Sequence, residues 1–270
     1  MEKMFDFSKT MCYDDIVNRS QTPNNVTKSS PADTDSGRRT GGTTMSEMLY
    51  GGAIGVIAGL AMNRIAVFQV KRRTTESAKR EAIDNIVLAV IWALISGILF
   101  AVIFKLYGTT AKRLEYLAYI SIVLAIGVVD LDIQKIPNLS VLALLVVRSA
   151  AVVYELVTGV SVKGALFPSA IGLVAAFILY QLPMFLHIPI GTGDVKFASA
   201  IGYCLGIFGF LQSAIIMAIG LVFFLVYLLT RKKGNLKTKV PMGPFLALGS
   251  VATIIYPVFT GLEQQVFPTL

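Results

Sequence analysis

Long apolar runs, separated by short polar or basic segments, make up most of this chain from about residue 48 onward. Several of them approach the ~20 residues that an α-helix needs to cross a bilayer. The pattern predicts an all-α, polytopic membrane protein with about eight transmembrane helices, or seven if the weakest turn, around 203–212, separates nothing. We expect the helices at about 48–70, 86–107, 117–129, 139–157, 164–186, 194–205, 210–229 and 241–259.

Composition agrees with this pattern and divides the chain in two. Hydrophobic residues make up 55% of the sequence and charged residues 15%, whereas soluble domains are about 25% charged. Residues 1–45 are instead rich in Ser, Thr, Asn, Asp and Gly, so they cannot bury enough apolar surface to fold alone. We therefore expect a flexible polar tail over 1–45, or a segment upstream of a start at Met45, followed by one membrane domain over 46–270.

The net charge of +8 comes from Lys and Arg that lie between the apolar runs. This distribution indicates the positive-inside rule and not nucleic-acid binding. With eight helices, the loops on one side carry twelve basic residues and those on the other side carry four. The richer side should therefore face the cytoplasm, in a protein of the plasma or inner membrane.

Cysteine chemistry contributes little to this picture. Cys12 and Cys204 are far apart and in different surroundings, so a structural disulfide is not expected. No C-x-x-C pair exists, which excludes a thiolate zinc site, and we predict no bound metal.

The first apolar run has small residues four apart, at Gly51, Gly55 and Gly59. This spacing places them on one face of a helix. We expect that face to pack closely against a neighbouring helix.

Two acids mark the ends of apolar runs. Asp130 ends the run before V-V-D-L-D-I-Q-K-I-P-N, and Asp194 begins the run after I-G-T-G-D-V-K. Carboxylates at the ends of membrane helices are costly, and the charge count places both on the cytoplasmic side. Two carboxylates that share a proton form the working part of an aspartic protease. Asp132 competes with Asp130 for this role, although it lies nearer the loop.

The residues around the two acids suggest how the acids are tuned. Gly191 and Gly193 lack Cβ, which permits φ > 0 and the close approach of a substrate strand. Asp194 begins a helix, where it would cap the N–H groups or be stabilised as an anion, and Asp130 ends one. We therefore expect Asp194 to be the more ionised of the pair. Lys135 and Lys196 are cytoplasmic anchors or tune the pair, and Pro137 stops the helix after Asp130.

Three motifs in order resemble the type IV prepilin leader peptidases. D-L-D-I-Q-K-I-P-N resembles their first aspartate motif, G-T-G-D-V-K their G-x-G-D-x-K motif, and V-P-M-G-P-F-L-A-L-G their final-helix motif. The resemblance implies that Asp130 and Asp194 are the catalytic pair. The supporting positions that it implies are Gly191, Gly193, Lys196, Asp132, Lys135, Pro137, Asn138, Pro241, Gly243 and Pro244.

The resemblance also implies an activity. It predicts an aspartic endopeptidase, without a cofactor, that removes a short basic leader from pilin-like precursors whose apolar helix lies in the bilayer. The larger family members carry a loop with two C-x-x-C pairs after the first helix and also N-methylate the product. Here that loop is about fifteen residues long and has no cysteine, so we predict peptidase activity without methyltransferase activity.

Two other classes of membrane protein use similar residues. A transporter also uses intramembrane acids and broken helices, although no internal inverted repeat is visible in this sequence. A presenilin-like protease shares G-x-G-D but carries Tyr-Asp at the first site and Pro-Ala-Leu near the end. This chain has Val129-Asp130 and Pro241-Met242-Gly243 at those places.

Overall fold

The computed structural model describes residues 45–73, 86–185, 191–230 and 242–257. Within these ranges the chain is all-helical, with seven helices and no strand. The helices are α2 (Met45–Arg73), α3 (Ile86–Leu106), α4 (Thr110–Ile133), α5 (Asn138–Val157), α6 (Val162–Phe185), α7 (Thr192–Thr230) and α8 (Gly243–Ile255). Apart from Met45, the polar tail predicted over 1–45 lies outside the described residues.

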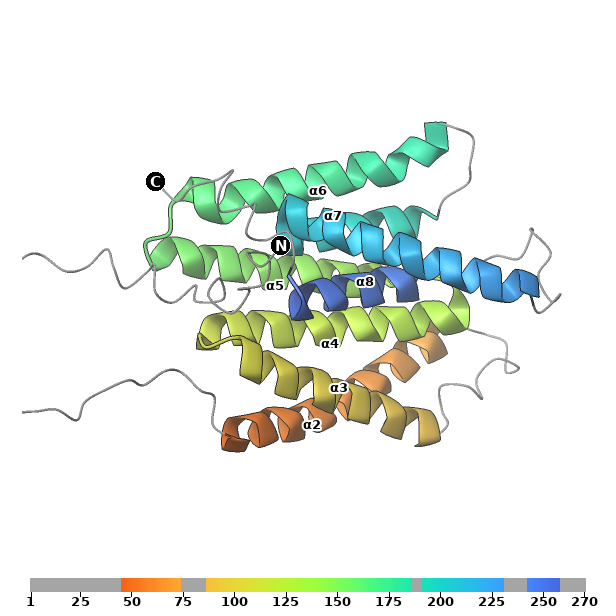
Figure 1. Cartoon of the computed structure of the whole chain (residues 1–270), viewed down its shortest axis with the longest axis horizontal. Coiled ribbons are helices and arrows are strands. Elements are labelled where there is room, and N and C mark those ends of the chain that lie inside the picture. The colour runs from red at the N-terminus through yellow and green to blue at the C-terminus, as the bar shows by residue number, and fades with distance from the viewer. Residues whose placement is uncertain (1–44, 74–85, 186–190, 231–241, 258–270) are drawn as a thin grey trace, which may run out of the picture.

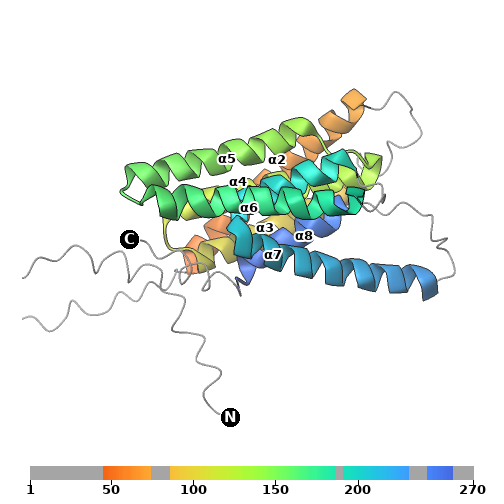
Figure 2. The same cartoon turned by 90° about the horizontal axis from the view of Figure 1, so that it is seen from above.

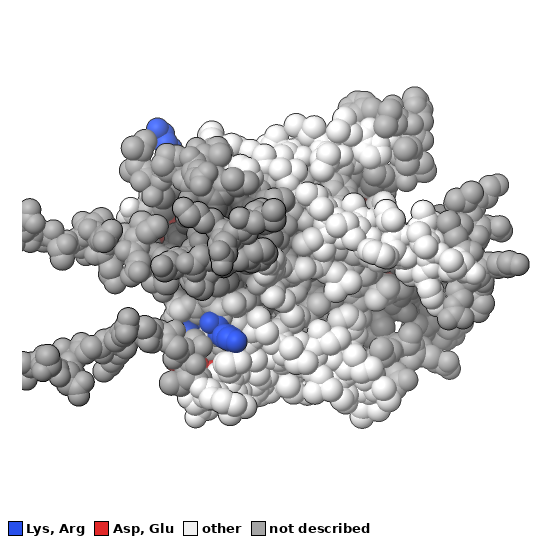
Figure 3. Space-filling view, viewed as in Figure 1, with Lys and Arg blue, Asp and Glu red and all other residues white. Residues whose placement is uncertain are grey.

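The surface of this bundle suits a bilayer. Six of the described helices are long and apolar enough to cross a membrane. Large apolar side chains are exposed along all of them, for example Ile57, Phe177 and Phe223. On the face shown in Figure 3 the described surface is almost entirely uncharged, and the few charged atoms lie mainly toward one end. The chain is therefore a multi-pass membrane protein, as its sequence predicts.

Helix α4 is the centre of the bundle, with α2 and α3 on one side, α5 and α6 on the other, and α8 alongside (Figures 1 and 2). In its most apolar stretch 61% of residues are buried, against 22–28% in the other five spans. Apolar residues such as Ile120, Val123 and Ile126 of α4 are fully enclosed. The helix that carries Asp130 is thus held on several sides.

The glycine face of α2 packs against α3, as predicted from its spacing. A Cβ on Gly55 would lie 2.6 Å from the carbonyl oxygen of Ser96, and one on Gly59 would lie 2.8 Å from Cα of Ala93. Both values are shorter than real Cβ contacts, so only glycine allows the two helices to cross this closely.

Helix α7 explains why the described chain has seven helices where the sequence suggested about eight. Gly206 has φ 70° and ψ 178°, which is not helical, inside the continuous range of α7. The two arms on either side of Gly206 run back along each other, so α7 behaves as a helical hairpin (Figures 1 and 2). The weak turn predicted around 203–212 is thus a single glycine, because that backbone conformation is essentially restricted to Gly.

Two glycines join α6 to the first arm of α7. A Cβ on Gly172 would collide with the backbone of Gly202, and a Cβ on Gly202 with that of Gly172. The helices therefore cross in direct backbone contact. Since they run antiparallel, this crossing fixes which residues of α6 face each residue of the first arm.

Helix α4 begins earlier than its apolar run. The sequence predicted a helix from about 117, whereas α4 starts at Thr110. The added stretch, 110–116, includes three charged residues, Lys112, Arg113 and Glu115. Each of the three is ion-paired: Arg113 with Glu47 of α2, and Lys112 and Glu115 within a larger cluster. Hydropathy does not register charges that are neutralised by partners on other helices.

Candidate active site

Asp130 lies in the last turn of α4 and is only 4% exposed. The helix ends soon after it, because Gln134 takes a left-handed conformation with φ 49° and donates its N–H to the carbonyl oxygen of Asp130. Ile136 and Pro137 are buried at the turn into α5. The D-L-D-I-Q-K-I-P-N segment is thus a tight α4–α5 connection that holds Asp130 inside the bundle.

The carboxylate of Asp130 lies against the N-terminus of α8. The backbone N–H of Gly243 donates a hydrogen bond to Oδ2 of Asp130 at 3.0 Å. A Cβ on Gly243 would lie only 2.6 Å from the same oxygen, so the position has room for glycine alone. A helix N-terminus presents free N–H groups and a partial positive charge, which suits an anion.

Asp194 lies in the first turn of α7, as its third residue and not in the cap position. The carbonyl oxygen of Gly191 accepts hydrogen bonds from the N–H groups of Asp194 and Val195, at 3.0 and 3.3 Å. A Cβ on Gly191 would lie 2.7 Å from Oδ2 of Asp194. Gly191 thus leaves space for the carboxylate that follows it.

Gly193 does not use the positive φ that the sequence analysis allowed for it. It lies inside α7 and has no positive φ, in contrast to Gly159 and Gly206. A Cβ on it would lie 3.3 Å from Cβ of Ile136. Its small size therefore allows the start of α7 to pack against the α4–α5 turn.

These packing contacts bring the two acids together. Asp194 lies within electrostatic range of Asp130, although 64 positions separate them in the sequence. Both are at the end of the bundle where α4 ends and where α7 and α8 begin (Figure 1). The backbones of α4 and α7 scarcely approach each other, so neighbouring helices set the relative position of the two carboxylates.

The other supporting residues whose side chains the structure describes divide into two groups, one packed in the bundle and one exposed. Pro137 is buried, and Pro244 lies in the first turn of α8, where its Cα would be 3.7 Å from a Cβ on Gly127 of α4. Lys135, Asn138 and Lys196 are exposed.

Lys196 makes no ion pair with Asp194 among the contacts that the structure describes. Asp132 belongs to α4, but its side chain is outside what the structure describes, and so is the whole of Pro241.

Tyr180 of α6 is a neighbour of Asp194 that sequence reasoning missed. Its ring is 7% exposed, its hydroxyl donates to Sδ of Met217 at 3.0 Å, and it lies within electrostatic range of Asp194. The signal was present in the glycines: if Gly172 lies opposite Gly202 in an antiparallel pair, then position 180 lies opposite 194.

A comparison with family models decides which known proteins this site resembles. Residues 117–234, somewhat less than half of the chain, match the model of the type IV leader peptidase family. This part of the chain is therefore similar to the type IV leader peptidase family. The matched segment contains both Asp130 and Asp194 and ends before the final-helix motif. No curated protein and no solved structure gave a match.

The match to the type IV leader peptidase family supports a membrane-embedded peptidase that acts on protein substrates. Within the described residues, no three His, Cys, Asp or Glu side chains gather as a metal site would require. Two neighbouring carboxylates can hold one proton between them, which suits them to activate water and to polarise a carbonyl group.

Proposed function

We propose that this protein is a membrane aspartic endopeptidase that removes the short basic leader from pilin-like precursors. Asp130 and Asp194 are its catalytic pair. The observation that carries the proposal is their proximity: two acids from distant parts of the sequence lie at the same end of an apolar bundle, in a segment that matches a leader peptidase family.

The surroundings of the two acids support different roles for them. Asp130 accepts a hydrogen bond from Gly243 at the N-terminus of α8, where the helix dipole favours negative charge. Asp194 has no such donor among its described contacts and is adjacent to the charge of Asp130. We therefore assign the ionised role to Asp130 and the protonated role to Asp194, the reverse of the expectation from sequence. That expectation considered the end of α4 and not the beginning of α8.

Catalysis then follows the chemistry of a carboxylate pair. Ionised Asp130 takes a proton from the attacking water while protonated Asp194 donates a hydrogen bond to the scissile carbonyl oxygen. The tetrahedral intermediate collapses as a proton passes to the leaving amine. This proton is the one that Asp130 took from the water, so Asp130 is ionised again when the C–N bond breaks. Asp194 keeps its proton throughout, and the resting pair is restored as the carbonyl group of the new carboxyl end re-forms.

The substrate must present a peptide bond at the end of the bundle and an apolar segment to the bilayer. A precursor with a basic leader, a small residue before the cut and an apolar helix after it meets both needs. The excess of Lys and Arg in the loops at this end supports a cytoplasmic site in the plasma or inner membrane. The basic leader then remains on the cytoplasmic side.

The same protein is expected to cleave without methylating. The loop between α2 and α3 spans only residues 74–85 and contains no cysteine. The cysteine-containing insert of the bifunctional leader peptidases therefore has no counterpart at this position.

The direct test uses the purified chain in lipid or mild detergent with a pilin-like precursor and labelled S-adenosylmethionine. We expect a new N-terminus directly after the leader, identified by mass spectrometry, and no labelled methyl group on it. Absence of cleavage with several such precursors would contradict the proposed substrate class. Cleavage that persists in Asp130→Asn and Asp194→Asn would contradict the proposed site.

A further inference from the structure

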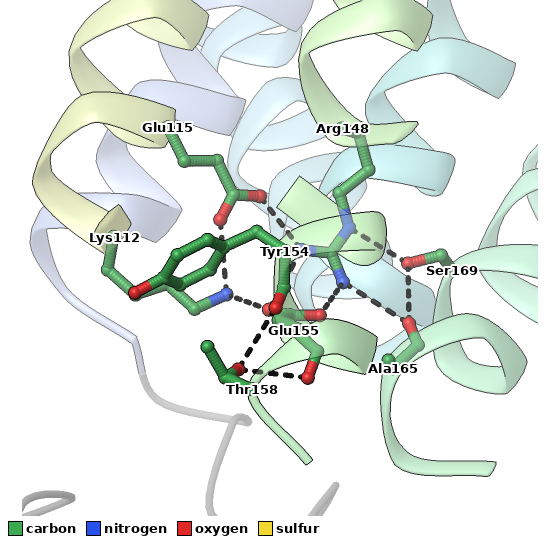
Figure 4. Close-up of polar contacts among 8 residues, drawn as sticks. All are labelled: Lys112, Glu115, Arg148, Tyr154, Glu155, Thr158, Ala165 and Ser169. Atoms are coloured by element: carbon green, nitrogen blue, oxygen red, sulfur yellow. Dashed lines mark hydrogen bonds and ion pairs between the residues drawn. The ribbon is translucent and has the colours of Figure 1, made fainter. Parts of the chain in front are cut away.

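Four charged side chains gather near the start of α4, toward the end of the bundle opposite Asp130. Figure 4 shows their contacts. Lys112 and Glu115 come from α4, and Arg148 and Glu155 from α5. We call these four residues the Arg148 cluster. Arg148 Nη1 lies 2.8 Å from Glu115 and 3.3 Å from Glu155, and Lys112 Nζ lies 2.6 Å from Glu155 and 3.1 Å from Glu115. Two acids and two bases thus neutralise each other.

Arg148 is the central residue of this cluster and links its own helix, α5, to α4 and α6. It is 8% exposed, and besides Glu115 of α4 it reaches α6, where it donates to Oγ of Ser169 at 3.0 Å and to the carbonyl oxygen of Ala165 at 3.4 Å. The backbones of α5 and α6 approach each other at few other places. A planar guanidinium with five donors is suited to hold several partners in fixed directions.

The cluster completes a path from one aspartate to the other. Asp130 and Glu115 lie on the same helix, 15 residues apart, which is about 22 Å of a rigid rod. Glu115 binds Arg148, which binds α6, and α6 is locked to the first arm of α7 where Gly172 meets Gly202. The first arm begins with the turn that carries Asp194. Since the backbones of α4 and α7 scarcely approach each other, their relative height depends in part on such intermediaries.

We propose that the Arg148 cluster is a positioning device for the distant site: the Glu115–Arg148 pair fixes the axial register of α4 against α5 and α6, and thereby the separation of Asp130 from Asp194. The proposal rests on the proposed function in so far as this separation matters for peptide cleavage. A displacement of about 1 Å between reacting groups can cost on the order of 100-fold in rate. Residues far from the chemistry can therefore control kcat without touching the substrate.

Two double variants separate positioning from simple loss of charge. Lys112→Met with Glu115→Leu removes the two cluster charges that α4 supplies and leaves Arg148 paired with Glu155 on its own helix. Lys112→Met with Glu155→Leu also removes one base and one acid, but leaves Arg148 paired with Glu115, so α4 stays joined to α5 and α6. Both variants retain a neutral pair at Arg148, and they differ only in whether that pair links the helices.

We expect the first double variant to lower kcat by about 10- to 100-fold with little change in KM. The bell-shaped pH profile of kcat/KM should also become narrower, because carboxylates that lie farther apart interact less and titrate more independently. The second double variant should keep kcat within about threefold and the profile unchanged. Equal losses in both variants, or full kcat in the first, would overturn the proposal.

A distance measurement tests the register without relying on activity. Spin labels at Leu131 of α4 and Leu182 of α6, both exposed, report the height of one helix against the other after Cys12 and Cys204 are replaced by Ala. We expect the distance to shift or broaden in the first double variant and to stay sharp in the second. If the wild-type chain cleaves no pilin-like precursor, the proposed function fails, and this measurement still decides the register. Identical distances in all three proteins would overturn the positioning role.

Discussion

The two ends of the bundle can be compared by how they hold charge. At one end, Lys112 and Arg148 each contact two acids, and the four charged groups of the cluster neutralise each other. At the other end, Asp130 and Asp194 lie within electrostatic range, and neither has an ion pair with the residues that the structure describes. The one described hydrogen bond to the carboxylate of Asp130 comes from the backbone N–H of Gly243.

The difference indicates what each end is for. Buried ion pairs with matched geometry lose little by leaving water, although the removal of one member is expensive. Two neighbouring carboxylates without a counter-charge destabilise the fold, and such groups gather where chemistry needs them. We therefore interpret the Arg148 cluster as the end that holds the helices and the aspartate pair as the end that reacts.

The reactive end should lose its activity and keep its fold when either acid is neutralised. We expect Asp130→Asn and Asp194→Asn each to lower kcat/KM by about 10²- to 10⁴-fold, the range typical of a lost general acid or base. Thermal stability should not fall, because the neighbouring like charge disappears and the amide oxygen introduced by Asp130→Asn can still accept the N–H of Gly243. Cleavage of a precursor and the melting temperature in detergent measure the two effects.

Asp132→Asn is the matched control for this prediction, since it changes an acid of the same turn. It should retain most of the activity. An inactive Asp132→Asn beside an active Asp130→Asn would move the catalytic role to Asp132.

The holding end should show the opposite response, with a loss of stability. Arg148→Met removes one of the two described cationic partners of the buried Glu115, leaves two acids against one base in the cluster, and removes the contacts with α6. The breaking of such a buried pair costs about 3–5 kcal/mol of unfolding free energy. Equilibrium unfolding in mixed micelles measures this loss. Arg64→Met is the control, because Arg64 is exposed and should change the unfolding free energy by no more than about 0.5 kcal/mol. Equal stability of Arg148→Met and the wild type would contradict the holding role.

The sequence alone singled out the two acids of the proposed reactive end, but not the cluster at the holding end. Apolar runs locate membrane helices because the bilayer imposes their length and composition, and the two acids stand out against such runs. The family match includes both acids. The resemblance named Gly243 as a supporting residue, but the sequence did not show that its N–H binds Asp130. That contact joins positions 113 residues apart, and no local pattern encodes it.

The Arg148 cluster shows a different limit. Arg148 interrupts an apolar run, and Lys112 and Glu115 lie in a stretch that hydropathy assigns to a loop. Their pairing depends on three helices that meet at one height, which periodicity within one helix cannot predict. The spacing of Arg148 and Glu155, two helical turns apart on one face, was the available local signal.

A change at Gly243 should disturb the reactive end without removing a charge. In Gly243→Ala the new Cβ would lie 2.6 Å from Oδ2 and 2.9 Å from Cβ of Asp130, so the carboxylate must shift. We expect kcat to fall by about 10- to 100-fold with KM little changed, since a displaced catalytic group affects the transition state more than binding.

Gly220→Ala is the control for Gly243→Ala. It lies on α7 beside Phe245 of α8, and its added Cβ would meet that ring at 3.4 Å, which is an ordinary contact. It should leave kcat within about threefold of the wild type. Full activity of Gly243→Ala would mean that Asp130 can shift without penalty, and would remove the α8 N-terminus from the site.

Tyr180 gives the smallest expected effect and decides whether the reactive end has a further polar partner. Its hydroxyl already donates to Sδ of Met217, which is a weak acceptor, and its ring packs near Phe210 with centroids 6.1 Å apart. Tyr180→Phe keeps the ring beside Asp194 and removes the O–H. We therefore expect kcat/KM to stay within about threefold of the wild type, the size of a weak hydrogen bond. Tyr180→Ala should lower kcat/KM further, because water would reach Asp194 through the space of the lost ring.

If kcat/KM of Tyr180→Phe instead fell by 100-fold at unchanged stability, the hydroxyl would have to turn from Met217 toward Asp194 or the substrate during cleavage. The reactive end would then contain a third catalytic group. The aspartate pair would also have more polar partners than the described contacts indicate, and would differ less from the Arg148 cluster.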